Sequence, residues 1–413
     1  MAYFVPMPWR RRAEHSPEDE FTREVIGLVQ DLLGLKATKL DDFALQIARP
    51  GSTPIQMNLH NVYAETRSVD GDERAQRLRT AVLAMVPSPR PETWSDAAPR
   101  LLPAVRAASW VAAAAGGAPQ SGRSARPFVR PLVPFVRVMC AIDSEHAMTF
   151  ATDNDLAAWG VTDDQAMRTA SGNLAQMQVR VARSGPEATV LDPDGYISSW
   201  LAAPSVLAQI AGTLGGTVVA LAPSRDRLIL LDVADAAAAV RVLENALQEY
   251  QSAPRRLSPV PYLVSDGGVE PWQPPASHPA RPIVDNASRI LAAFEYGQQQ
   301  SRLEDQLLKA GEDVFIAKYA LMQRQDGSMW SWVAWVKQVT NGLVPEADVV
   351  LLGDNDDPDA RFAVRWSDAL RLAGDTLHEE PAFDPPRWRY RGWPDSDSLA
   401  ALKEQAVPFP PPV

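Results

Sequence analysis

The chain has 413 residues, 46% of them hydrophobic and 22% charged, and its formal net charge is −11 at pH 7. This length predicts two or three domains, and the composition is typical of a globular protein. The acidity argues against binding a nucleic-acid backbone through the overall field, because phosphates carry charge of the same sign.

Cysteine usage and hydropathy indicate the compartment. Cys140 is the single cysteine, so no disulfide can form within the chain, which favours a reducing cytoplasm. No apolar run approaches about eighteen residues, so we expect no membrane span. The basic start, Arg10–Arg12, is followed by no apolar run and is not a secretory signal. We expect residues 1–15 to be disordered.

The first elements follow from capping and periodicity. Ser16, Pro17 and the acids after them predict the start of an amphipathic helix. Alternating apolar residues predict strands at 43–47 and 55–59, and residues 73–85 predict a second helix.

Arginines and prolines dominate residues 113–134. We interpret this segment as a basic loop; the alternative is a ligand for a groove that binds extended proline helices. A buried strand at 135–142 and a short strand at 148–150 follow. Thr152 and Thr162 then predict the starts of two helices.

A second strand–strand–helix unit spans residues 217–250, with a turn near Asp226. Two such units predict an α+β fold, in which a mixed sheet carries helices on one face. Eight prolines in residues 254–282 argue against a helix or a central strand there, although Tyr262–Val264 is a candidate edge strand. Asp326-Gly327 predicts a hairpin and Asn341-Gly342 another turn.

These signals define the predicted domains. We expect an α+β domain, a proline-rich linker, a domain with one helix and tryptophan-rich β structure, and a tail that is proline-rich and disordered at its end. The residue ranges are 16–272, 273–286, 287–395 and 396–413.

Several short elements share the order and spacing of a known family. They are Leu102–Arg106, Asp143 at a strand end, Ala170–Leu174, Asp194–Tyr196, Pro223–Asp232 and Leu257–Pro271. On these elements, residues 20–272 resemble the YtpQ-like bacterial family of unknown function 1444. The resemblance implies a cytoplasmic bacterial domain with no known reaction. Ile197 and Pro204 depart from the pattern, so we expect the helix at Pro204 to kink or restart.

A second resemblance covers residues 312–370. Phe315 and Lys318, the tryptophan strand with Trp330 and Trp332, and the Asn-Gly turn are similar to the bacterial family of unknown function 2314. The acidic residue expected before the tryptophan strand is missing.

Reactive groupings are scarce in the sequence. No two of the five histidines lie three to five residues apart, and none pairs with Cys140, so we expect no structural zinc and no cofactor. Asp143, Asp226 and Asp232 border predicted strands. They are candidate Mg²⁺ or acid–base carboxylates if the hairpin tips meet; otherwise they end strands and cap helices.

Five further residues are candidate binding residues. Asn173 lies in mid-helix, where a structural hydrogen bond is the alternative role. Tyr196 is a candidate because it belongs to the Asp-Gly-Tyr motif of the family resemblance. Trp330 and Trp332 share one strand face and Trp335 points to the other, so one face is core and the other is a candidate platform for a partner. The alternative is that all three tryptophans serve core packing alone.

Three hypotheses follow. The first is a non-catalytic interaction or accessory module that binds a protein or peptide through the tryptophan-rich domain or the proline-rich segments, with no nucleic acid and no membrane. The second is a Mg²⁺-dependent hydrolase that uses the three aspartates. The third is a purely structural subunit, which predicts a large exposed apolar patch.

Overall fold

The computed structural model describes residues 16–41, 43–48, 54–67, 69–84, 90–116, 127–144, 148–191, 196–381 and 383–409. The chain divides into two compact units, Met1–Pro91 with Asp143–Thr149 and Glu92–Ile142 with Phe150–Val413. The predicted linker at 273–286 therefore falls inside the second unit. The disorder predicted for residues 1–15 and for the end of the tail, at 410–413, falls outside the described residues.

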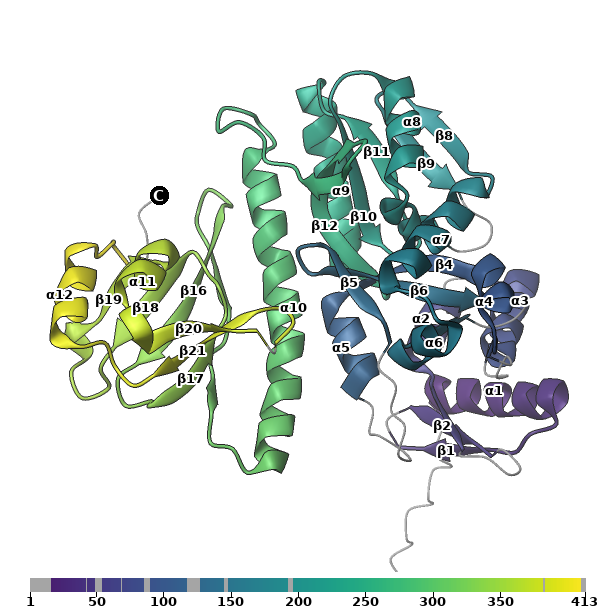
Figure 1. Cartoon of the computed structure of the whole chain (residues 1–413), viewed down its shortest axis with the longest axis horizontal. Coiled ribbons are helices and arrows are strands. Elements are labelled where there is room, and N and C mark those ends of the chain that lie inside the picture. The colour runs from purple at the N-terminus through teal and green to yellow at the C-terminus, as the bar shows by residue number, and fades with distance from the viewer. Residues whose placement is uncertain are drawn as a thin grey trace, which may run out of the picture. The chain divides into compact units, whose positions relative to one another are not determined.

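The fold is α+β, as predicted, and the C-terminal region is mainly strand (Figure 1). None of the helices in the described ranges combines the length and hydropathy that crossing a bilayer requires.

The first unit packs three helices on the antiparallel sheet β1-β2-β3. α1 begins where predicted, because the Ser16 side chain accepts a hydrogen bond from the Asp19 backbone N–H and Pro17 occupies the first turn. Strand β1 and helix α2 have no counterpart in the prediction. The elements are α1 (Pro17–Leu33), β1 (Ala37–Leu40), β2 (Ala44–Ile47), β3 (Ile55–Asn58), α2 (His60–Thr66) and α3 (Gly71–Leu83).

The second unit opens with the strand order β4-β6-β5. Thr152 and Thr162 cap α6 and α7 as predicted, each accepting a hydrogen bond from a backbone N–H three residues later. The elements are α4 (Trp94–Ala97), η1 (Ala98–Arg100), β4 (Leu101–Ala107), α5 (Ala108–Gly116), β5 (Val129–Val133), β6 (Val136–Asp143), β7 (Met148–Phe150), α6 (Asp153–Trp159) and α7 (Asp163–Gln176). The last residue of β6 and the first two of β7 are assigned to the first unit.

The basic, proline-rich segment is not a loop throughout, and the prediction for residues 113–134 is corrected in two places. α5 continues to Gly116, and β5 pairs with β6. Pro131 is compatible with β5 because this strand lies at the end of the strand order, where a missing N–H breaks no ladder. Residues 117–126 lie outside the described residues.

A larger sheet, the central sheet, has the order β13-β12-β10-β11-β9-β8. The predicted hairpin and helix are present as β10, β11 and α9, and Asp235 caps α9. Before them, the 3-10 helix η2 ends at Ala202 and the α-helix α8 begins at Pro204, so the helix restarts at this proline, as predicted. The elements are β8 (Arg180–Ser184), β9 (Glu187–Leu191), η2 (Ile197–Ala202), α8 (Pro204–Leu214), β10 (Val218–Ser224), β11 (Ile229–Asp232), α9 (Ala236–Ser252), β12 (Arg256–Ser265) and β13 (Gly268–Pro271).

Strand β12 overturns the expectation that the prolines after residue 254 exclude a central strand. β12 lies between β10 and β13, and it contains Pro259 and Pro261. The pairing with β10 shifts register between Ser258 and Tyr262, so both prolines fall in a bulge. A bulge leaves residues out of the ladder, so the missing N–H groups break no hydrogen bond there.

Helix α10 (Arg281–Ala310) is thirty residues long and includes the end of the predicted linker. It contacts β12, α9 and α5 and also the C-terminal strands β14, β15 and β16. Figure 1 shows the helix in green between these two groups of elements. α10 therefore links the central sheet to the C-terminal strands within the second unit.

The C-terminal strands form two sheets, β14-β17-β21-β20 and β15-β16-β18-β19. The hairpin predicted at Asp326-Gly327 joins β15 to β16. The elements are β14 (Phe315–Ile316), β15 (Ala320–Gln323), β16 (Met329–Val336), β17 (Asn341–Val344), β18 (Val349–Gly353), η3 (Pro358–Ala360), β19 (Phe362–Arg365), α11 (Trp366–Leu372), η4 (Gly374–Thr376), β20 (Leu377–Glu380), β21 (Arg387–Arg391) and α12 (Ser396–Glu404).

Asn341-Gly342 is not the predicted turn, because both residues belong to β17. Gly342 lies opposite the buried Tyr390 of β21, and a Cβ atom at this position would overlap the tyrosine ring. The glycine therefore serves close packing of an aromatic side chain rather than a chain reversal.

Arg387 of β21 fixes the C-terminal sheet to α10. Its side chain is fully buried, and its Nε donates to the Gln299 Oε1 at 2.6 Å. The guanidinium also donates to the backbone carbonyls of Tyr296, Ala317 and Leu343, at 3.0 to 3.4 Å. Burial lowers the pKa of Arg387 to about 10.

We predict that Arg387→Met destabilises the protein by at least about 3 kcal/mol, because several buried acceptors lose their donor at once. Urea unfolding at pH 7 measures the change. The control is Arg391→Met at the exposed end of the same strand. A loss below about 1 kcal/mol for Arg387→Met would contradict this role.

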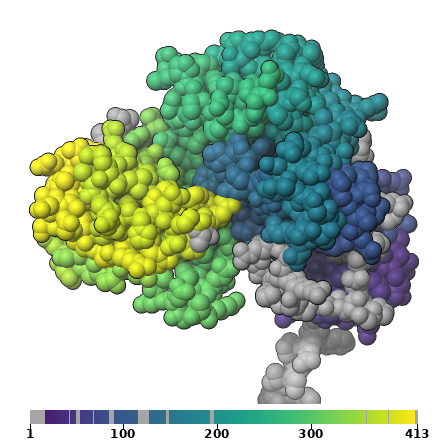
Figure 2. Space-filling view, viewed as in Figure 1, coloured from purple at the N-terminus to yellow at the C-terminus, as the bar shows by residue number. Residues whose placement is uncertain are grey.

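Glu295 is a buried acid on α10. Its carboxylate accepts from the backbone N–H and the hydroxyl of Ser109 on α5, at 2.7 and 3.0 Å. Burial raises the pKa of Glu295 to about 7, while the Ser109 hydrogen bonds and the Arg137 charge oppose that rise. Arg137 in turn binds Asp384 with an Nε–Oδ2 distance of 2.6 Å. Figure 2 shows the yellow C-terminal surface meeting a blue surface.

We predict that stability falls as the pH rises from about 4.5 to about 7, because the folded state holds the Glu295 proton more tightly than the unfolded chain does. Each pH unit of pKa difference is worth about 1.4 kcal/mol, so the effect is at most about 3 kcal/mol. Denaturant unfolding of the wild type and Glu295→Gln at several pH values measures it. Glu295→Gln should lack this part of the decrease in unfolding free energy with pH. An equal decrease in the wild type and the variant would show the prediction wrong.

Candidate functional site

One face of α10 lines a cleft of about 380 Å³. The helix contributes Asp285, Ser288, Arg289, Ala292 and Tyr296. Their spacing of three or four residues places these side chains on one side of the helix. The N-terminal half of α10 therefore presents a polar and aromatic face to the cleft.

The opposite wall comes from distant parts of the second unit. Ser331 belongs to β16, Tyr319 precedes β15, and Glu346 and Asp348 lie between β17 and β18. The remaining lining residues are Pro134, Phe135, Gln273 and Ala347.

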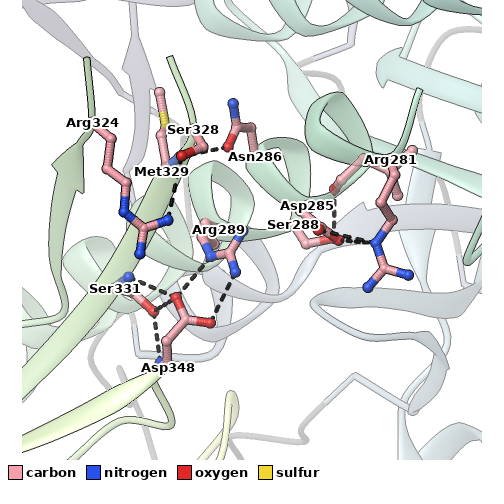
Figure 3. A network of polar contacts seen from close by, with 11 residues as sticks. Arg281, Asp285, Asn286, Ser288, Arg289, Arg324, Ser328, Met329, Ser331 and Asp348 are labelled. Carbon is pink, nitrogen blue, oxygen red and sulfur yellow. Dashed lines mark hydrogen bonds and ion pairs between the residues drawn. The ribbon is translucent and has the colours of Figure 1, made fainter. Parts of the chain in front are cut away.

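The floor of the cleft is a closed polar network around Asp348 (Figure 3). The Arg289 guanidinium donates two hydrogen bonds to the carboxylate, from Nε at 2.7 Å and from Nη2 at 3.0 Å. Ser331 donates to the same carboxylate from its backbone N–H at 2.7 Å and its hydroxyl at 2.9 Å. The hydroxyl in turn accepts from the Asp348 N–H.

This network decides the charge state of the floor. Burial by itself would raise the pKa of Asp348, but the hydrogen bonds and charge of Arg289, together with Ser331, hold it below its usual value. Asp348 is therefore ionised at neutral pH. Its charge is balanced by Arg289, so the pair adds no net charge to the cleft.

Two contacts extend the network along α10. Arg281 Nε donates to the Asp285 carboxylate at 2.9 and 3.0 Å. Asn286 accepts from the Met329 backbone N–H at 2.8 Å and thereby ties the helix to the first residue of β16 (Figure 3). The acid at Asp285, like Asp348, has a guanidinium partner.

The rings of Phe135, Tyr296 and Tyr319 form one wall of the cleft, the aromatic wall. Tyr296 stacks on Tyr319 with centroids 5.6 Å apart, and Phe135 meets Tyr296 edge-on at 5.5 Å. Burial raises the pKa of Tyr319 to about 12 and also raises that of Tyr296, so both phenols are neutral at physiological pH.

Glu346 is a charged residue of the cleft lining that takes no part in this network. Among the described residues its carboxylate has neither a hydrogen-bond partner nor an ion-pair partner. Burial, and after it the negative charge of Glu379, raises the pKa of Glu346. Its negative charge also raises the pKa of Tyr296 and of Tyr319, which line the same cleft. The cleft therefore has one carboxylate free to bind a cation.

The possible nucleophile and base of the cleft, Ser331 and Asp348, are both engaged in the polar network. Ser331 is buried and its hydroxyl is held on both sides by Asp348. The carboxylate beside it is a weak base, because Arg289 stabilises its ionised form. No histidine or cysteine is among the described residues that line the cleft.

The structure does not bring together the predicted aspartates of the second unit, Asp226 and Asp232. Asp226 follows β10 and forms an ion pair with Arg255 at 3.7 Å, whereas Asp232 ends β11 opposite Val218, at the other end of the hairpin. Asp232 accepts from the Ala234 N–H at 3.0 Å, as a residue that ends a strand does. Asp143 ends β6 and falls in the first unit. The described residues hold no cluster of three metal-ligating side chains.

Asn173 has the structural role that the sequence leaves open. Its side-chain amide donates to the carbonyls of Ala98 and Leu101, at 2.7 and 2.9 Å, and so ties α7 to the start of β4. Tyr196 is buried and precedes η2. Asp194, from the same motif, lies outside the described residues.

Arg106, another residue of the family resemblance, is buried in the same unit as Tyr196. Its guanidinium lies over the rings of Trp110 and Phe150, 5.5 and 5.8 Å from their centroids. Burial, followed by the charge of Arg225, lowers the pKa of Arg106 to about 9, and the charges of Tyr196 and Asp226 oppose this shift.

The tryptophans of β16 divide between two faces, as their spacing predicts. Trp335 is fully buried in the core, and its Nε1 donates to the Gly392 carbonyl at 3.1 Å. Trp330 and Trp332 lie on the other face, where both contact Phe409.

Sequence reasoning missed the cleft residues altogether. The signal was the recurrence of polar residues at 285, 288 and 289 on one helix face, within a segment partly assigned to the linker. Their partners, Ser331 and Asp348, lie more than forty residues away, and nothing local links them to α10.

In comparisons with known proteins, no family model, curated protein or solved structure matches the chain. The resemblance to families 1444 and 2314 stays a prediction.

We predict that Arg289→Met destabilises the protein by about 1–2 kcal/mol at pH 7, because a partly buried carboxylate loses its charged donor. In the wild type the Arg289 contribution is present above the usual aspartate pKa and is lost as the pH falls and Asp348 becomes protonated. The difference between variant and wild type should therefore shrink near pH 3. Urea unfolding at both pH values measures it, with Arg391→Met as the control, and a difference independent of pH would contradict the assignment.

Proposed function

We propose that the protein is a non-catalytic binding module of the bacterial cytoplasm, and that its cleft holds a basic side chain of a partner protein. The supporting observation is the Glu346 carboxylate, which is unpaired among the described residues and lines the same cleft as the stacked Tyr296 and Tyr319. The cytoplasmic assignment has the support of a single buried cysteine.

A lysine or arginine side chain fits this chemistry better than a neutral or acidic one. The other lining charges are already balanced, by the pairs Arg289–Asp348 and Arg281–Asp285, so the net charge that a ligand meets is that of Glu346. The faces of tyrosine rings attract cations and also cover an aliphatic stem. An acidic ligand would instead be repelled by Glu346 and by the neighbouring Glu379.

A peptide selection tests the proposal. Random heptapeptides displayed on phage, selected on the intact chain, should become enriched in lysine or arginine. The strongest peptide, made synthetically, should lose at least about tenfold in affinity when its basic residue is replaced by norleucine, because tenfold corresponds to about 1.4 kcal/mol. Its affinity should also fall as salt rises, because the pair is partly exposed. Fluorescence anisotropy measures both changes.

Glu346→Gln should lower the affinity for the selected peptide by a similar factor. The matched control is Glu312→Gln, at the exposed residue that follows α10, which should leave the affinity unchanged. Enrichment of acidic peptides, or equal binding by Glu346→Gln and the wild type, would refute the proposal.

A further inference from the structure

A second surface, separate from the cleft, lies on the outer face of β15 and β16. The pairing of these strands sets Met322 opposite Trp330 and Ala320 opposite Trp332, so the four side chains share one face. Ser331, Val333 and Trp335 are the buried residues of β16 that point the other way. We name the set Met322, Trp330 and Trp332 the tryptophan face.

The chain itself covers part of this face. The ring of Phe409 meets Trp330 edge-on with centroids 5.3 Å apart, and it meets Trp332 in the same way at 5.5 Å. Trp330 is only 3% exposed, although it points away from the core that contains Trp335. Phe409 therefore packs against the indole rings of Trp330 and Trp332 in the edge-to-face geometry that aromatic rings prefer. We call this position between the two indoles the seat.

The path of the tail explains how Phe409 reaches the seat. Val407 donates its N–H to the Ala363 carbonyl of β19 at 2.8 Å, at the far edge of the order β15-β16-β18-β19. Neighbouring strands are about 4.8 Å apart and Val407 lies one such spacing beyond β19, so it is roughly 14 Å from β16. Two extended residues cover roughly 7 Å, and the phenylalanine side chain spans the remainder. Pro408 helps, because its fixed φ favours the extended form.

The contact between Phe409 and the tryptophan face is suited to reversible opening. Phe409 remains 36% exposed and Met322 42% exposed, so the seat is only partly closed. Beyond α12, within the part of the tail that the structure describes, the Val407–Ala363 bridge is the backbone contact that holds the tail to the sheet. Phe409 lies between prolines in the sequence, and such a segment loses little conformational entropy when it binds an aromatic surface.

We propose that the tryptophan face is a binding site for a proline-flanked phenylalanine, and that its resident ligand is the Pro408–Phe409 segment of the chain's own tail. The tail competes with any other segment of the same chemistry for one seat. Because a short tether gives an effective concentration in the millimolar range, the tail occupies the seat unless it is removed or outcompeted.

A chain that ends at Val407 tests this proposal, because it keeps the bridge to Ala363 and loses the occupant. The probe is a fluorescein-labelled peptide with the sequence of residues 407–413. The truncated chain should bind it, and the full-length chain should bind it at least about tenfold more weakly because of the tethered competitor. A peptide with alanine in place of phenylalanine should not bind. Fluorescence anisotropy measures all three.

Two variants of the truncated chain locate the site. Met322→Glu changes a 42% exposed side chain of the tryptophan face and should abolish binding, whereas Leu370→Glu changes a 38% exposed side chain on α11 and should not. Thermal unfolding of both variants confirms that they are folded. Exchange of tails between two full-length copies, seen as a dimer that Phe409→Ala abolishes, would also support the seat. Absence of peptide binding by the truncated chain, or binding unaffected by Met322→Glu, would overturn the proposal.

Discussion

The buried guanidinium of Arg387 is the constraint on which the second unit depends. It carries a charge in a fully buried position, and it is held by an amide oxygen and three backbone carbonyls rather than by a carboxylate. Two of these acceptors belong to α10, through Tyr296 and Gln299. Gln299 also donates to the Pro385 carbonyl at 2.6 Å, so β21 and α10 hold each other at fixed positions. Such a network is stable only when every member is satisfied.

The position of α10 determines the cleft. Tyr296 is the link between the two, because its backbone carbonyl accepts from Arg387 while its ring forms the aromatic wall and its hydroxyl donates to the Pro386 carbonyl. One helical turn or more toward the N-terminus, Arg289 meets Asp348 and Asn286 meets Met329. The side chains that line the cleft are therefore fixed by the same contacts that join α10 to the C-terminal strands. Such a site is rigid before any ligand arrives, which limits the entropy that binding has to overcome.

Local signals predicted much of the fold and little of the site. Ser16, Thr152 and Thr162 cap helices where expected, because a cap is a contact between residues three apart. The exceptions are places where tertiary structure outweighs a local preference. Pro259 and Pro261 fit a central strand because a bulge removes the need for their N–H groups. Gly342 lies in a strand because Tyr390 needs the space that a side chain would fill.

The two proposed binding surfaces differ in a way that follows from how each is built. The cleft combines residues from α10 with residues of the C-terminal strands, and its unpaired carboxylate selects for charge. The tryptophan face is a single sheet surface, formed by neighbouring strands and selective for shape and apolar area. Ser331 faces the cleft while Trp330 and Trp332 face the other side, because successive residues of a strand alternate. Strand β16 therefore supplies both surfaces, and a ligand on either one acts on the same strand without competing for the same side chains.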